Sequence, residues 1–172
     1  MSDRTDIAAA HAAAPGTVSG LHAALMVRLA ALAAGFQLLE TKSNVRPPSV
    51  VGGWLPPKTT DVEQFPFLIV RPRSGVDSEQ GADQDARATL QIIVGTLSDT
   101  DDGWVDVLLL IDAIRADLGA QPSITGTGYE QTGPLTWEIP EQQPRPQWFG
   151  TITTNWTLPR PQRAEARNPQ EG

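Results

Sequence analysis

Two long segments of alternating polar and apolar residues constrain the fold of this chain more than any other feature of the sequence. In residues 86–97 Leu90, Ile92 and Val94 fall on one side of the alternation, and in residues 147–158 one side holds Trp148, Ile152, Trp156 and Leu158. Successive side chains of a β-strand point to opposite faces of the sheet, so both segments are predicted to be strands with one buried face. Shorter strands are predicted over residues 65–71 and 135–139.

An apolar stripe predicts the first helix. Large apolar residues recur at intervals of three and four from Leu21 to Leu39, which places them on one side of a helix. Thr17 or Ser19 can cap its amino terminus. The opposite side is mostly alanine and carries little charge. We therefore expect this helix to be covered on both sides, either within the fold or by a second subunit.

A second helix is predicted after the acidic run that begins at Asp99. Asp99 or Thr100 can cap this helix, and the carboxylates of the run complement the positive end of the helix dipole. Trp104 is predicted to lie in its buried stripe. Leu109 and Leu110 widen that stripe beyond what a single core contact needs.

The order of these elements predicts an α+β fold. Two helices pack with a mainly antiparallel sheet of about four strands in the order α-β-β-α-β-β. The chain has 172 residues, which suits one domain. We expect that domain to span residues 17–159, between a flexible amino-terminal arm, residues 1–16, and a disordered carboxyl-terminal tail, residues 160–172.

Composition excludes several kinds of function. The chain has no cysteine, which rules out disulfides, thiol nucleophiles and cysteine-zinc sites. Its net charge of −7 argues against a general nucleic-acid binder, because such proteins neutralise phosphates. Arg28 interrupts the most apolar stretch, and no secretory signal is apparent, so no membrane association is expected.

No catalytic motif stands out. The chain lacks the nucleophile elbow of hydrolases and the paired histidines of zinc peptidases, and the acidic run after Ser98 fails the spacing of a calcium loop. We therefore expect a protein that is not an enzyme and has no cofactor, metal site or catalytic residue. The alternative of another class is a small hydrolase that uses Asp83, Asp85 or Asp99.

The tryptophans divide into groups. Trp104 and Trp156 are predicted to be core residues, whereas Trp137 can face either way. Trp148 and Phe149 are adjacent in a strand and must point to opposite faces. Either one of these two rings lies at a protein interface, or the two helices cover both faces of the sheet.

An acidic segment separates two of the predicted strands. Residues 73–85 form a linker that is long for a hairpin, and its acids are Asp77, Glu79, Asp83 and Asp85. On the inside of a ring such a loop would repel DNA and let it slide, whereas on the outside it would aid solubility. Both readings stay open on the residues alone.

Three blocks resemble a known family in their order and spacing. They are residues 65–72 after the loop 54–58, residues 102–115 after a strand, and residues 148–159. Together they resemble the tail terminator (tail completion) proteins of long-tailed, non-contractile bacteriophages. The resemblance covers roughly residues 20–160 and includes no catalytic signature.

The resemblance implies a structural subunit of the virion. Such proteins close into a hexameric ring that caps the tail tube, stops its polymerisation and offers a docking surface to the neck or connector of the head. The partners would be copies of the chain, the major tail tube protein and the neck proteins, with genomic DNA passing through the bore without specific binding. The protein would be assembled in the host cytoplasm and lie at the head–tail junction.

Under this resemblance the acidic loop fits a bore or ring contact. Candidate residues for contacts with other subunits or with the tube are Trp54, Arg71, Arg73, Leu109, Leu110, Trp148 and Phe149. The alternative within the same class is another neck component, a stopper or head-completion protein.

Overall fold

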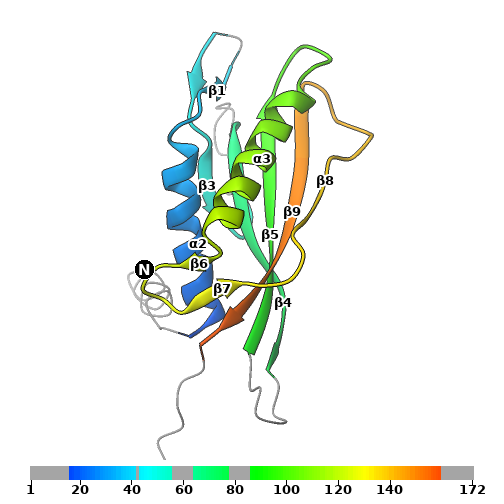
Figure 1. Ribbon diagram of the computed structural model, residues 1–172. Coiled ribbons are helices and arrows are strands. Elements are labelled where there is room, and N and C mark those ends of the chain that lie inside the picture. The colour runs from blue at the N-terminus through cyan, green and yellow to red at the C-terminus, as the bar shows by residue number, and fades with distance from the viewer. Residues whose placement is uncertain (1–15, 42, 56–63, 78–85, 160–172) are drawn as a thin grey trace, which may run out of the picture.

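Two helices lie on one face of a strongly curled β-sheet that forms a half-barrel (Figure 1). The computed structural model describes residues 16–41, 43–55, 64–77 and 86–159. Helix α2 spans Val18–Ala33 and helix α3 spans Trp104–Ala120. The strands are β1 (Leu38–Leu39), β2 (Val45–Arg46), β3 (Ser49–Gly52), β4 (Phe67–Asp77), β5 (Ala86–Leu97), β6 (Ser123–Ile124), β7 (Tyr129–Gln131), β8 (Thr136–Glu138) and β9 (Gln147–Leu158). The predicted α+β class is confirmed, with more strands than expected.

The sheet is mixed, with strand order β3-β4-β5-β9-β7-β6, and β8 also pairs with β9. Only the pairing of β3 with β4 is parallel. Strands β5 and β9 pair antiparallel along their whole lengths, from Ala86↔Leu158 to Leu97↔Gln147. The predicted strands correspond to β4, β5, β8 and β9. The other strands have two to four residues, too few for a recognisable alternation.

Two predicted boundaries are wrong. The segment expected to be a linker from residue 73 begins as strand, because β4 continues to Asp77, which pairs with Ala86 of β5. A bulge between Pro72 and Ser74 lets the strand continue past the proline. Helix α2 ends at Ala33 instead of Leu39, and Leu39, the last residue of the predicted stripe, lies in β1.

The helix starts differ in how they are capped. The Thr17 side chain accepts a hydrogen bond from the Gly20 N–H at 3.0 Å, which confirms one of the two caps expected for α2. Neither Asp99 nor Thr100 caps α3: its N-cap is Gly103, which has no side-chain cap bond. A Cβ on Gly103 would lie 2.2 Å from Nε1 of Trp148, so close packing against this indole sets the position of the helix start.

Both helices pack on the same face of the sheet. Leucines of α2 and the apolar stripe of α3 join the inward side chains of β4, β5 and β9 in one cluster. Trp156 is completely buried in it, as predicted. Arg28 of α2 connects the two helices, because its Nε donates to Oδ2 of Asp117 at 2.7 Å and its Nη2 donates to the Asp117 carbonyl oxygen.

A separate aromatic cluster lies on the opposite face. Phe65, Phe67 and Phe149 contact one another there, with ring centroids 4.9 to 6.2 Å apart. Ile69 is buried with them, and no helix residue belongs to this cluster. The prediction that Trp148 and Phe149 face opposite ways is confirmed. The idea that the two helices cover both faces is wrong, since they share one face.

The described domain begins and ends at neighbouring points. A Cβ on Gly16 would lie 2.4 Å from the carbonyl oxygen of Pro159. The Tyr129 hydroxyl accepts from the Gly16 N–H and donates to the Thr17 carbonyl oxygen, both at 3.1 Å. These bonds fix the start of α2 against β7, and Pro159 lies beside the same point. Over the described residues, neither helix has the length and hydrophobicity to cross a membrane.

Replacement of Gly95 by alanine should destabilise the fold. A Cβ at this position would lie 2.3 Å from Cζ of Phe67, and Phe67 is 1% exposed, so its ring has no room to retreat. Overpacking of this kind costs about 1–3 kcal/mol in free energy of unfolding, measurable by urea denaturation. The matched control is Gly119→Ala in α3, where a Cβ meets nothing within 4 Å and should stabilise by roughly 0.5–1 kcal/mol. Equal effects of the two changes would contradict this packing.

Candidate interaction surfaces

A single tryptophan stands out from the β3 edge of the sheet. Trp54 follows β3 and is 71% exposed. The Arg71 guanidinium lies over its ring, with Cζ 4.7 Å from the ring centroid, and Arg71 Nε donates to the Gly53 carbonyl oxygen at 3.0 Å. Gly53 has φ +74° and donates its N–H to the Val70 carbonyl oxygen. Trp54 is therefore exposed and yet held in one orientation.

The edge beside Trp54 is basic and irregular. Strand β3 pairs with β4 only as far as Val70, so within the described chain no strand covers the outer side of residues 71–77. Arg71 and Arg73 form no ion pair with any described residue. Pro72 has no N–H to donate and is followed by the bulge. Charge, proline and bulges on an edge all oppose uncontrolled strand pairing, so this edge favours side-chain contacts.

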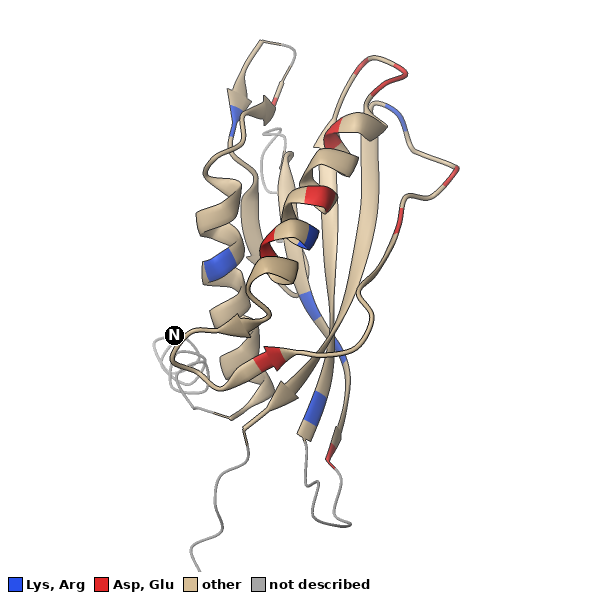
Figure 2. Cartoon of the chain, in the orientation of Figure 1, with Lys and Arg blue, Asp and Glu red and all other residues tan. Residues whose placement is uncertain are grey.

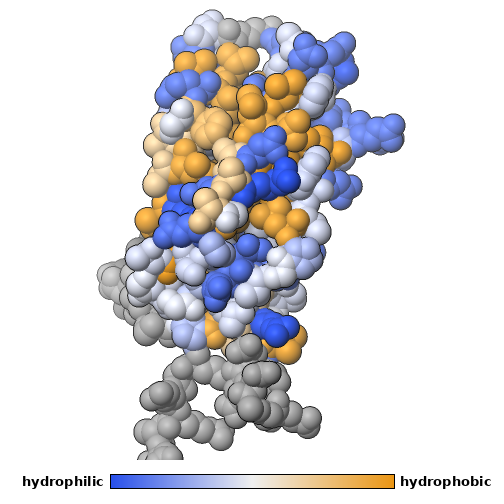
Figure 3. All heavy atoms as spheres, viewed as in Figure 1, coloured by the Kyte–Doolittle hydropathy of each residue, from blue (hydrophilic) through white to orange (hydrophobic). Residues whose placement is uncertain are grey.

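An apolar groove lies on the other side of the molecule, between the start of α3 and the β8 segment. Its volume is about 360 Å³. The walls come from Trp104 and Leu108 of α3 and from Trp137, Ile139 and Pro140, and the indole of Trp148 also lines it. Trp104 is 44% and Trp137 is 45% exposed. Figure 3 shows that apolar residues gather over the upper half of this face of the molecule.

Glu141 is the acidic residue that lines this groove, and Asp102 and Glu138 lie within two residues of lining residues along the chain. Asp102, Glu138 and Glu141 are exposed and form no ion pair with the rest of the described chain. Arg115 and Arg145 are also near, but each is paired, with Asp112 and with Asp101 respectively. Figure 2 shows acidic residues at this upper end, over the loop before α3 and around β8, and basic residues lower on β4 and β5. The side of the sheet beside β8 thus carries several acids, whereas the outer side of β4 carries Arg71 and Arg73, with Asp77 at the end of that strand.

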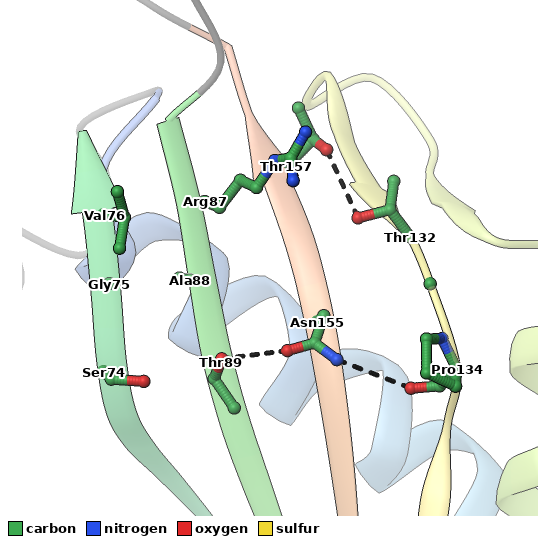
Figure 4. A pocket seen from close by; sticks show the side chains of 11 residues that line it. Ser74, Gly75, Val76, Arg87, Ala88, Thr89, Thr132, Pro134, Asn155 and Thr157 are labelled. Carbon is green, nitrogen blue, oxygen red and sulfur yellow. Dashed lines mark hydrogen bonds between the residues drawn. The ribbon is translucent and has the colours of Figure 1, made fainter. Parts of the chain in front are cut away.

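A hollow of about 670 Å³ lies on the helix-free face of the sheet. Figure 4 shows that its polar side chains bond to one another: Thr89 Oγ1 donates to Oδ1 of Asn155 at 2.9 Å, and the Asn155 amide donates to the Pro134 carbonyl oxygen. Thr157 and Thr132 form a further bond of 3.4 Å. These bonds connect β5, β9 and the segment before β8, which indicates a structural role for the hollow.

Chemically active groups do not gather in the described residues. No three histidine, aspartate or glutamate side chains of this part of the chain are placed to hold a metal ion together. Burial raises the pKa of the Asp106 carboxyl, in the first turn of α3. Of the acids considered for a hydrolase, Asp99 lies exposed in the loop before α3, and Asp83 and Asp85 lie outside the described residues.

The predicted contact residues divide into surface and interior positions. Trp54, Arg73 and Leu109 are exposed, and Arg71 is half-buried beneath the ring of Trp54. Leu110 was wrongly expected at a surface: it is 1% exposed, because its turn of α3 faces the sheet. Trp148 is also buried, at 6% exposure, and reaches a surface only as part of the groove lining.

The remaining predicted positions are less accessible. Phe149 is half-buried within the aromatic cluster of the open face. In the acidic loop, Asp77 is exposed at the end of β4, whereas Glu79, Asp83 and Asp85 lie outside the described residues. A role of this loop in a bore therefore stays a prediction.

Sequence reasoning missed the groove. The prediction that Trp104 is buried is wrong. It shares a helical face with core residues, but it lies at the first position of α3 and is only partly covered, with Trp137 and Trp148 beside it in the groove. The sequence did not predict which way Trp137 faces. In the structure it lies in β8, and all three residues of this strand are exposed. One signal could have predicted the groove: one tryptophan lies at the first position of a helix and the other in a very short strand, and at such positions the core can cover only part of the ring.

A scan against models of known protein families and a search of curated proteins found no match to this chain.

Two adjacent leucines of α3 should respond differently to truncation. Leu110→Ala should lower the free energy of unfolding by about 2–5 kcal/mol, because the side chain is fully buried. Leu109→Ala should change it by less than about 0.5 kcal/mol, because this side chain is 52% exposed. Urea denaturation of the isolated subunit measures both values, and a large cost at Leu109 would contradict the placement of α3.

Proposed function

We propose that the protein is a tail terminator of a long-tailed, non-contractile bacteriophage. Copies of the chain form a ring, expected to be a hexamer, that caps the tail tube and stops its growth. The ring also provides the docking surface for the neck or connector, with the genome passing through its bore. The family resemblance of the three sequence blocks suggests this function.

The observation that best supports the proposal is the exposure of tryptophans at two separate places on one sheet. Trp54 is exposed at the β3 edge, and Trp104 and Trp137 are exposed beside β8. Aromatic residues are favoured at protein interfaces, and exposing several of them is unfavourable for a lone subunit. Two different surfaces on one chain suit a head-to-tail contact between copies. Such a contact closes into a ring when the rotation from one copy to the next is a whole fraction of a full turn.

The charge distribution is compatible with a bore that passes DNA. A bore that lets DNA slide should not present many free arginines, because these bind phosphates. The described arginines of β4, Arg71 and Arg73, lie at the edge where a neighbouring copy would cover them. The ring would be part of the virion at the head–tail junction, after assembly in the host cytoplasm.

Purified protein should stop the growth of tail tubes. Tubes polymerised from the matching major tail protein would be mixed with the protein and imaged by negative-stain electron microscopy. We expect a cap on one end of each tube. We also expect the tubes to become shorter when far less than one copy of the protein is present per tube subunit, because a single ring blocks the growth of a whole tube end.

Two results would count against this proposal. Tubes that grow to their normal length in excess protein, with no cap at either end, would overturn it. Binding to isolated connectors in the absence of tubes, without any effect on tubes, would replace it with a stopper or head-completion function.

A further inference from the structure

We propose that Trp54 of one copy inserts into the groove between α3 and β8 of the next copy. This inference deepens the proposed ring and rests on the assembly of copies of this chain. It names the contact that holds neighbouring subunits together. The occupant of the groove is therefore a second copy, and the contact is heterologous.

Trp54 has the properties of an anchor. Its ring is largely exposed, and the Arg71 guanidinium at 4.7 Å holds it in place. Gly53 and Val70 fix the backbone beneath it through a hydrogen bond of 2.8 Å. A side chain already held in one orientation loses little conformational entropy on binding, which is the main cost of ordering an interface residue. A buried aromatic side chain removes roughly 150–250 Å² from water.

The groove has the properties of a receptor for such a ring. Its volume of about 360 Å³ leaves space for a side chain, and its walls are mostly aromatic and aliphatic. Trp104 and Trp137 form its exposed walls, and Gln143 and Glu141 add polar atoms at its border. Hot spots of interfaces are typically aromatic anchors in pockets of this kind, surrounded by a polar rim.

Charge complementarity identifies the partner as another copy. The anchor has Arg71 beneath it and Arg73 two residues further along β4, and neither forms an ion pair with a described residue. Glu141 lines the groove, and Asp102 and Glu138 lie within two residues of its lining residues along the chain. None of these three acids forms an ion pair with a described residue. Opposite potentials on two surfaces steer their encounter and fix their register. Both halves of this complementary pair belong to one sequence.

The topology excludes self-insertion and favours a ring. Trp54 follows β3, and the groove borders β8, and strands β4, β5 and β9 lie between β3 and β8 in the sheet. One copy can therefore donate its tryptophan to a neighbour and receive that of another at the same time. Such a contact leaves one free anchor and one free groove on every open chain of subunits until the chain closes.

A mixing experiment with two variants tests this contact. Trp54→Ala removes the anchor and leaves the groove intact, whereas Pro140→Arg fills the groove with a charged side chain and leaves the anchor intact. Both positions are exposed, so the fold should persist, as circular dichroism can check. The matched control is Val27→Ala on α2, which is 72% exposed and lies outside both surfaces. Native mass spectrometry, with and without tail tubes, gives the size of each assembly.

We expect rings from the wild type and from Val27→Ala, and monomers from each of the other two variants alone. The loss of a hot-spot tryptophan should weaken the contact roughly 30-fold or more. An equal mixture of Trp54→Ala and Pro140→Arg should form one-to-one pairs and nothing larger, because only one anchor meets one free groove. Trp137→Ala, which removes a groove wall, should behave like Pro140→Arg.

Four outcomes would overturn the inference. They are a ring formed by Trp54→Ala, a mixture that contains only monomers, pairs formed by either variant alone, and a wild type that stays monomeric both free and on tubes. A ring lost in Pro140→Arg but kept in Trp54→Ala would assign the groove to another occupant, such as a terminal segment of the chain. The same experiment separates the contact from the proposed function. If Trp54→Ala still caps tubes as a ring, the proposed function stands and the proposed contact between Trp54 and the groove is wrong. If the wild type forms rings through this contact and leaves tubes untouched, the contact stands and the proposed function fails.

Discussion

Burial of one face of the sheet by both helices is the constraint on which the rest of the structure depends. The ladder between β5 and β9 runs without interruption over both strands, so their alternating side chains divide cleanly between the two faces. Glycines let the layers approach closely. A Cβ on Gly150 would lie 2.6 Å from Cγ1 of Val107, and one on Gly103 would meet the Trp148 indole. The core under the helices therefore accepts little change in volume.

Because both helices pack on one face of the sheet, no helix covers the aromatic residues on the opposite face or at the borders of the sheet. The three phenylalanines of the open face cover one another. Trp54, Trp104 and Trp137 remain partly or mostly exposed at the two borders of the sheet. Scattered apolar residues are common on protein surfaces. Here, however, the stacked tryptophan lies beside arginines and the aromatic groove is lined by Glu141, and none of these charged groups forms an ion pair within the described residues, so the two surfaces are chemically complementary.

The long, regular patterns of the sequence predicted the fold well. The alternation over residues 86–97 and 147–158 predicted β5 and β9 with correct bounds, and Thr17 marked the start of α2. The parallel strand β3 could not be predicted, because its pairing with β4 depends on the path of a proline-rich connection. The exposure of Trp104 was not predicted, because helical periodicity gives the side of a helix on which a residue lies but not how completely the core covers the first residue of that helix.

The neighbouring positions of Gly16 and Pro159 have a practical consequence. The Tyr129 hydroxyl binds the backbone where the domain begins, and the Pro159 carbonyl lies against that same point. The fold is thus nearly a closed loop, so a short peptide could join its two ends and new termini could be opened elsewhere. In a closed assembly, labels placed at Gly16 or at Pro159 would lie on the same side of each subunit and report the same orientation.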